Sequence, residues 1–146
     1  MGLERLHVLT VAARDLDELL RGVLAIVREE FGDVQAAGAL VRDGDRFRLR
    51  AALGVHEGAR ISITNGDLGA VAEALGRDGL GGLAIAPLAA AGEIHGMLYV
   101  CATPALTSEQ QARLTAIAAQ AAPAVALLAV KVDAARRARQ QAAVAD

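Results

Sequence analysis

Apolar and polar positions divide the chain into helical and strand-like segments. From Leu3 to Phe31 the apolar residues recur at helical spacing, so one face of this segment is predicted to lie in a core. Asp15 precedes the main apolar stripe, and Glu18 follows three residues later, a pairing typical of a helix N-terminus. The pattern therefore predicts a helix over 15–31, preceded by a shorter helical stripe.

The next segment, 36–54, has the pattern of a β-hairpin. Asp43 and Gly44 form a tight-turn signal between two strand-like runs. The return strand alternates between an apolar face and a basic face, with Phe47, Leu49 and Ala51 on the first and Arg46, Arg48 and Arg50 on the second. Period-two alternation predicts that the first face is buried and the second is exposed to solvent.

The remaining elements follow in a simple order. The pattern predicts a short strand over 60–63, a helix over 67–75, two strands over 83–88 and 96–100, and a long helix over 107–141. Sequential antiparallel strands between terminal helices predict an α+β fold, with one antiparallel sheet and the N- and C-terminal helices on one of its faces.

The last predicted helix has two apolar faces. One stripe is expected to pack on the sheet: Leu114, Ile117, Ala121, Val125, Leu128 and Val132. A second apolar stripe contains Ala116, Ala119, Leu127 and Val130. Because one monomer has too little material to cover both faces, the pattern predicts a homodimer through the terminal helices, with this second stripe at the interface.

Length and composition fit one intracellular domain. Of 146 residues, 54% are hydrophobic and 22% are charged, which indicates a globular domain over 1–132 and a polar helix end or frayed tail over 133–146. The formal net charge of −2 gives no reason to expect nucleic acid or an anionic membrane as a partner. A single cysteine and the lack of a signal-peptide pattern favour a cytoplasmic location.

No group of residues carries the pattern of an active site. Cys101 has no basic neighbour in sequence and is expected to be a buried small hydrophobe. The three histidines, His7, His56 and His95, lack metal-ligand spacing. The glycine-rich stretches 66–69 and 79–82 lack the residues of a phosphate loop. We therefore expect no enzymatic activity, no metal and no cofactor.

Several short motifs in order resemble the GAF domain family, with its GAF/profilin-like fold. They are the helix 15–31, the hairpin ending at Leu53-Gly54, Gly66-x-x-Gly69, Ala86-Pro-Leu88, Gly96-x-Leu98-x-Val100 and the alanine-rich run 118–124. The resemblance implies a sensory or regulatory domain of signalling proteins that acts through dimerisation and a partner protein. For a ligand, it favours the face of Arg46, Arg48 and Arg50 together with Gly66 and Gly69 at the middle helix.

One departure from the family bears on ligand binding. Ligand-binding GAF domains have a long lid segment before the Pro-Leu strand, whereas here only Gly76 to Gly82 connects the two elements. A small-ligand sensor with a compact pocket is the first alternative, and it requires a cavity with convergent polar groups. A roadblock-type dimeric interaction module is the second alternative. An interaction module instead predicts a filled interior and an exposed apolar patch on the terminal helices.

Overall fold

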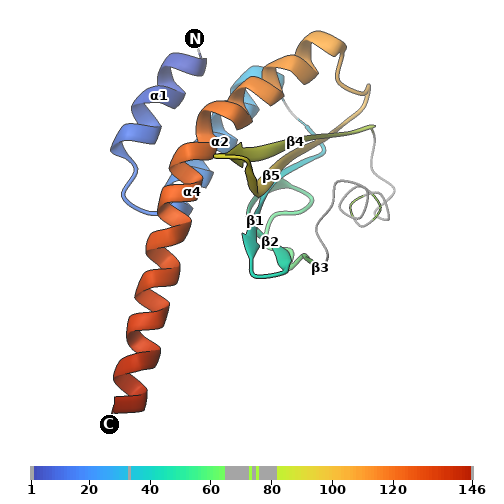
Figure 1. Ribbon diagram of the computed structural model, residues 1–146. Coiled ribbons are helices and arrows are strands. Elements are labelled where there is room, and N and C mark those ends of the chain that lie inside the picture. Colours follow the sequence, from blue (N-terminus) through green and yellow to red (C-terminus); the bar gives the residue numbers. More distant parts are fainter. Residues whose placement is uncertain (1, 33, 65–72, 74, 76–81, 146) are drawn as a thin grey trace.

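The computed structural model describes residues 2–32, 34–64, 73, 75 and 82–145. Its elements are α1 (Gly2–Ala12), α2 (Leu16–Phe31), β1 (Ala36–Asp43), β2 (Arg46–Gly54), β3 (Ser62–Thr64), β4 (Gly82–Ala90), β5 (Glu93–Ala102) and α4 (Ser108–Ala145). The strands form one antiparallel sheet in the order β3-β2-β1-β5-β4. The helices α1, α2 and α4 lie on one side of this sheet (Figure 1), which confirms the predicted α+β architecture.

Both predicted helix starts are capped by side chains. The Glu18 backbone N–H donates to Oδ1 of Asp15 over 2.7 Å, while Glu18 Oε2 accepts from the Arg14 N–H over 3.2 Å. At α4 the cap is reciprocal. The Gln110 N–H donates to Thr107 Oγ1, and the Thr107 N–H donates to Gln110 Oε1. These contacts satisfy backbone donors that the helix itself leaves unpaired.

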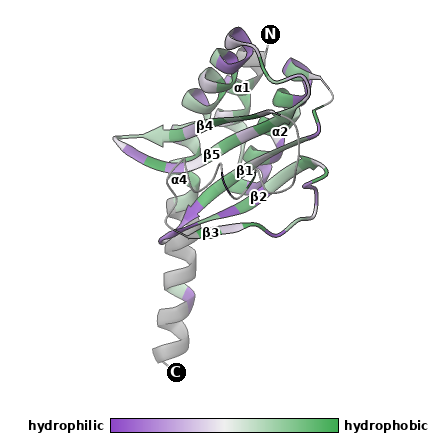
Figure 2. Ribbon diagram, turned by 90° about the vertical axis from the view of Figure 1, so that its right-hand side faces the viewer, coloured by the Kyte–Doolittle hydropathy of each residue, from purple (hydrophilic) through white to green (hydrophobic). Residues whose placement is uncertain are grey.

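The sheet has a buried cluster on each face. On β1, Ala37, Ala39 and Val41 face the helices, whereas Ala36 and Leu40 belong to a separate cluster on the opposite face. The predicted sheet-facing stripe of α4 is buried from Leu114 to Leu128. The opposite face, which is turned toward the viewer in Figure 2, is packed by these residues: Ala36, Leu40, Phe47, Ile63, Leu75, Met97, Tyr99 and Cys101. Cys101 is buried there, as predicted.

A β-bulge in β2 overturns the predicted face of Ala51. Leu49 pairs with Leu40 and Ala51 pairs with Ala39, so Arg50 is an extra residue without a partner position on β1. The extra residue reverses the alternation, because side chains in a strand point to opposite faces with period two. Leu49 therefore packs on the face opposite the helices, whereas Ala51 packs under the helices.

Tyr99 fills the centre of the face opposite the helices. Its hydroxyl lies 2.7 Å from Nδ1 of His56, which is the buried polar residue of the described core. The ring lies directly over Gly38 on β1, where an added Cβ would be only 2.6 Å from Tyr99 Cε2. The glycine thus leaves room for the aromatic ring, and the histidine satisfies the buried hydroxyl.

The helix α4 is the longest element and continues to Ala145. Pro123 lies inside it, and Figure 1 shows that the helix changes direction part-way along its length, as expected where a proline removes a backbone hydrogen bond. Residues Ser108–Ala129 are long and apolar enough to cross a membrane by composition. A helix that packs on a soluble core passes the same test, and this one packs on β4 and β5.

Candidate functional site

The predicted arginine face forms part of a surface cleft at the β2–β3 corner of the sheet. The cleft, called the arginine cleft below, has a volume of about 480 Å³. It is lined by Asp43, Arg46, Arg48, Leu49, Arg50, Ala59, Arg60, Ile61 and Ser62. Four arginines and one aspartate line it, so its formal charge is strongly positive although the chain carries a net charge of −2.

The strand register explains why two arginines stand together. Arg48 pairs with Val41, which faces the helices, so Arg46 and Arg48 lie on the helix side of the sheet, where α2 covers other parts of β1 and β2. Nε of Arg48 lies 3.3 Å from Oδ2 of Asp43. Nη1 of Arg46 donates to the hydroxyl of Ser62 over 3.5 Å. The arginine side chains are largely exposed, so their contacts are weak and readily exchanged.

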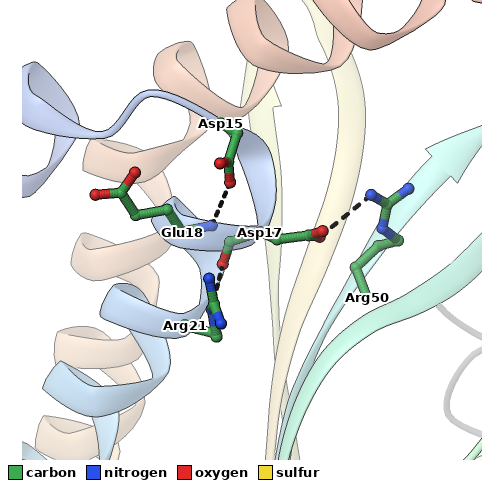
Figure 3. A network of polar contacts seen from close by, with 5 residues as sticks. All are labelled: Asp15, Asp17, Glu18, Arg21 and Arg50. Carbon is green, nitrogen blue, oxygen red and sulfur yellow. Dashed lines mark hydrogen bonds and ion pairs between the residues drawn. The ribbon is translucent and has the colours of Figure 1, made fainter.

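Arg50 differs from the other two because it contacts α2. Its Nη2 lies 3.2 Å from Oδ1 of Asp17, and Nε of Arg21 donates to the Asp17 carbonyl over 3.3 Å (Figure 3). A second cleft of about 480 Å³ opens beside this contact and is called the α2–β2 cleft. It is lined by Asp17, Arg21, Leu24, Arg50, Ala51, Ala52, Leu53 and Glu57. Arg50 therefore lies between two clefts of different charge.

The outer surface of the terminal helices exposes three large apolar side chains beside polar residues such as Glu4 and His7. Leu127 on α4 is 59% exposed, and Val8 and Val11 on α1 are 65% and 75% exposed. On α4, Ala119 is also exposed and Ala116 is half-buried, while the side chain of Val130 lies outside the described part of the structure. The helices α1 and α4 pack against each other, so these residues belong to one layer of the molecule.

The inner side of α1 is held by close packing on α2. Leu6 is fully buried, and Leu9 lies over Gly22, where an added Cβ would be 2.4 Å from Leu9 Cδ2. The small residue on α2 thus lets α1 dock closely. Because the inner side of α1 is occupied in this way, its exposed valines are not needed for packing within the monomer.

The histidines and the glycine stretches add no second site to the described structure. Nε2 of His95 lies 3.3 Å from the Ala90 carbonyl, and His56 contacts Tyr99. Among the described residues, no group of three or more histidine, cysteine or acidic side chains converges as a metal site. Gly66, Gly69, most of the predicted helix over 67–75 and the connector over 76–81 lie outside the described residues.

Sequence patterns indicated three of the cleft arginines but missed two residues that shape the site. Arg60 was predicted to start a strand, and only the pairing of β3 with β2 brings this segment beside Arg46 and Arg48. Asp17 is 33 residues away from Arg50 in sequence, and no local signal links them. Both contacts depend on tertiary structure.

Comparison with known proteins identifies the fold. No family model matches the sequence, and no curated protein matches it. Among solved structures, the chain is similar to the GAF domain of a phosphoenolpyruvate-protein phosphotransferase from Acinetobacter, with a TM-score of 0.70, 16% identity, and coverage of 88% of this chain and 93% of that one.

Two further similar structures agree. One is the GAF domain of A. aeolicus nlh2 in an inactive state, with a TM-score of 0.69, 13% identity, and coverage of 86% and 94%. The other is a methyl-accepting chemotaxis protein, residues 122 to 287, with a TM-score of 0.64, 16% identity, and coverage of 86% and 97%. Together with the sheet order and the helix layer, these likenesses show that the chain has the fold of a GAF domain.

Proposed function

We propose that this chain is a non-catalytic regulatory domain of a cytoplasmic signalling system, which works as a homodimer joined through α1 and α4. The observation that carries the proposal is the exposure of large apolar side chains on the terminal helices, with Leu127, Val8 and Val11 more than half exposed. Exposed large apolar side chains that gather in one layer favour a protein interface over a solvent-facing surface.

The arrangement along α4 suits a helix–helix contact. Ala119, Pro123 and Leu127 follow one another at intervals of four residues, so they share one exposed face of the helix. The alanine is small enough to let a second helix approach closely, and the leucine offers apolar area to bury. A two-fold arrangement would place this face against its own copy, because a symmetric dimer uses the same patch on both subunits.

A regulatory role is supported by the fold and by the described surface. The similar structures include GAF domains, one of them in an inactive state, and a chemotaxis protein. The face of the sheet opposite the helices is packed by Tyr99, Met97 and Leu40. Both clefts lie at the surface and are lined mainly by arginines, carboxylates and alanines. A domain of this kind responds to a change in its contacts with other molecules, and a dimer interface can transmit that change between the two subunits.

The test is the mass of the protein in solution and the effect of Leu127→Glu on it. We expect light scattering at micromolar concentration to give a dimer mass for the wild type and a monomer mass for the variant. A carboxylate without a partner in an apolar interface costs several kcal/mol, enough to raise a micromolar dissociation constant beyond the assayed range. The melting temperature of the variant, measured at a concentration where it is monomeric, reports whether its fold is intact.

Val55→Glu is the matched control. Val55 is 65% exposed and follows β2, away from the terminal helices, so the same substitution should leave the dimer mass unchanged. A monomer mass for the wild type, or equal dissociation of both variants, would contradict the proposal.

A further inference from the structure

The arginine cleft carries more positive charge than the described residues around it neutralise. Within the described part of the chain, Asp43 faces Arg48 and Asp17 faces Arg50, each at the edge of the cleft. Arg46 contacts only the neutral Ser62 hydroxyl there. Arg60 lines the same cleft and forms no ion pair with any described carboxylate. No ion pair among the described residues therefore joins Arg46 or Arg60 to a carboxylate, and the other two arginines are held by partly exposed pairs.

Three apolar residues also border the cleft. Leu49 and Ile61 are half-buried and line it together with Ala59. The two segments are held together by a hydrogen bond from the Leu49 N–H to the Ile61 carbonyl, over 2.9 Å. The side chains of Leu49 and Ile61 pack against the cluster on the face opposite the helices, so Arg46 and Arg48 stand on a hydrogen-bonded pair of segments anchored in the core. Charged groups in a row along such a strand suit an extended peptide.

We propose that the arginine cleft binds an acidic segment of a partner protein in extended conformation. Arg46 and Arg48 are two residues apart on one strand, so their stems are separated by roughly 7 Å along it. In an extended peptide, side chains at alternate positions share one face with the same spacing. A segment with aspartate or glutamate at alternate positions therefore matches the two arginines, each of which can hold a carboxylate through two hydrogen bonds.

Asp43 and Asp17 act as internal competitors in this arrangement. Each already neutralises one arginine that lines the cleft, and an incoming carboxylate must replace it or share its partner. Removal of either aspartate should therefore strengthen binding, whereas removal of an arginine should weaken it. A surface that is merely basic would also bind more weakly after removal of an arginine, but its binding would not depend on the spacing of the acidic residues in the peptide. The inference specifies the partner-binding surface of the regulatory domain proposed above, but it does not depend on dimerisation.

The experiment uses the full chain and two labelled synthetic peptides of the same composition. One carries two aspartates at alternate positions among alanine and leucine residues, and the other carries the same two aspartates three positions apart, so that they lie on opposite faces of an extended chain. Binding is followed by fluorescence anisotropy. We expect the alternating peptide to bind about tenfold more tightly than the peptide with the wider spacing, since only its acids reach both arginines at once. Binding should weaken strongly between about 0.01 M and about 1 M salt, as the Debye length falls from roughly 30 Å to 3 Å.

Variants then assign the binding to the cleft. The double variant Arg46→Gln, Arg60→Gln should bind the alternating peptide about tenfold more weakly, and Asp43→Asn should bind it about two- to fivefold more tightly. Arg28→Gln with Arg113→Gln is the matched control, because both arginines lie on helices outside the cleft and the change in net charge is the same.

Three results would overturn the proposal: no binding of either peptide, equal binding of both, or equal weakening by the control. All these side chains except Asp43 are largely exposed, and a melting curve of each variant confirms that it folds. Light scattering on the same samples reports the dimer separately, so a failure here is distinct from a failure of the helical interface.

Discussion

Gly38 lies at the centre of the sheet, and its replacement by alanine tests the packing of the face opposite the helices. β1 pairs with β5 through Gly38 and Tyr99. An added Cβ at this position would lie 2.6 Å from Tyr99 Cε2 and 2.7 Å from both Cζ and Oη. The ring is fully buried between neighbouring side chains, so it has no free space to turn into. The methyl group must therefore displace the ring, the strand, or both.

The expected loss of stability follows from three contributions. Overpacking a core position costs about 1–3 kcal/mol. Displacement of the ring also weakens the 2.7 Å contact between Tyr99 Oη and His56 Nδ1, a buried hydrogen bond worth about 1 kcal/mol. The lower backbone entropy of alanine in the unfolded chain offsets about 0.4–1 kcal/mol. We expect Gly38→Ala to destabilise the protein by about 1–3 kcal/mol, which corresponds to a melting temperature lower by roughly 3–10 °C.

The assay is a double-mutant cycle with Tyr99→Leu, measured by chemical denaturation. Leucine removes the ring atoms that the new methyl group would meet, so Gly38→Ala should cost little or nothing in that background. The two substitutions should therefore be non-additive, with a coupling of about 1 kcal/mol or more. Additive effects, or an alanine variant as stable as the wild type, would refute this account of why the strand carries a glycine at this position.

The remaining predictions concern helix packing and capping. Thr107→Ala removes the hydroxyl that accepts from the Gln110 N–H, so it should lower the free energy of unfolding by about 1 kcal/mol. Thr107→Ser keeps a hydroxyl and should retain most of the stability; equal effects of the two variants in denaturant titrations would contradict the cap. Gly22→Ala should loosen the packing of α1, because the new methyl group would meet Leu9, so hydrogen exchange of the α1 amides should become faster. When Leu9 is also replaced by alanine, Gly22→Ala should no longer change the exchange rate.

Elements with local signals were predictable from the sequence. The helix caps at Asp15 and Thr107 depend on residues three positions apart, and the hairpin depends on the turn at Gly44, where φ is +66°. Apolar periodicity gave the sheet-facing side of α4, because burial of a helix stripe depends mainly on its own spacing. The α+β class followed from the order of these elements, and motif order led to the correct fold family.

Only the tertiary structure decided which side chains meet at the clefts. A bulge inserts Arg50 into β2 and moves Ala51 to the other face, and no residue in the alternating run signals where the register shifts. The pairing of β3 with β2 brings Arg60 to the other arginines, and α2 supplies Asp17 as the partner of Arg50. Helix caps and turns form between residues that are a few positions apart in sequence, whereas these contacts join distant segments. Their geometry is set by strand register and helix docking, which arise from the packing of the whole sheet.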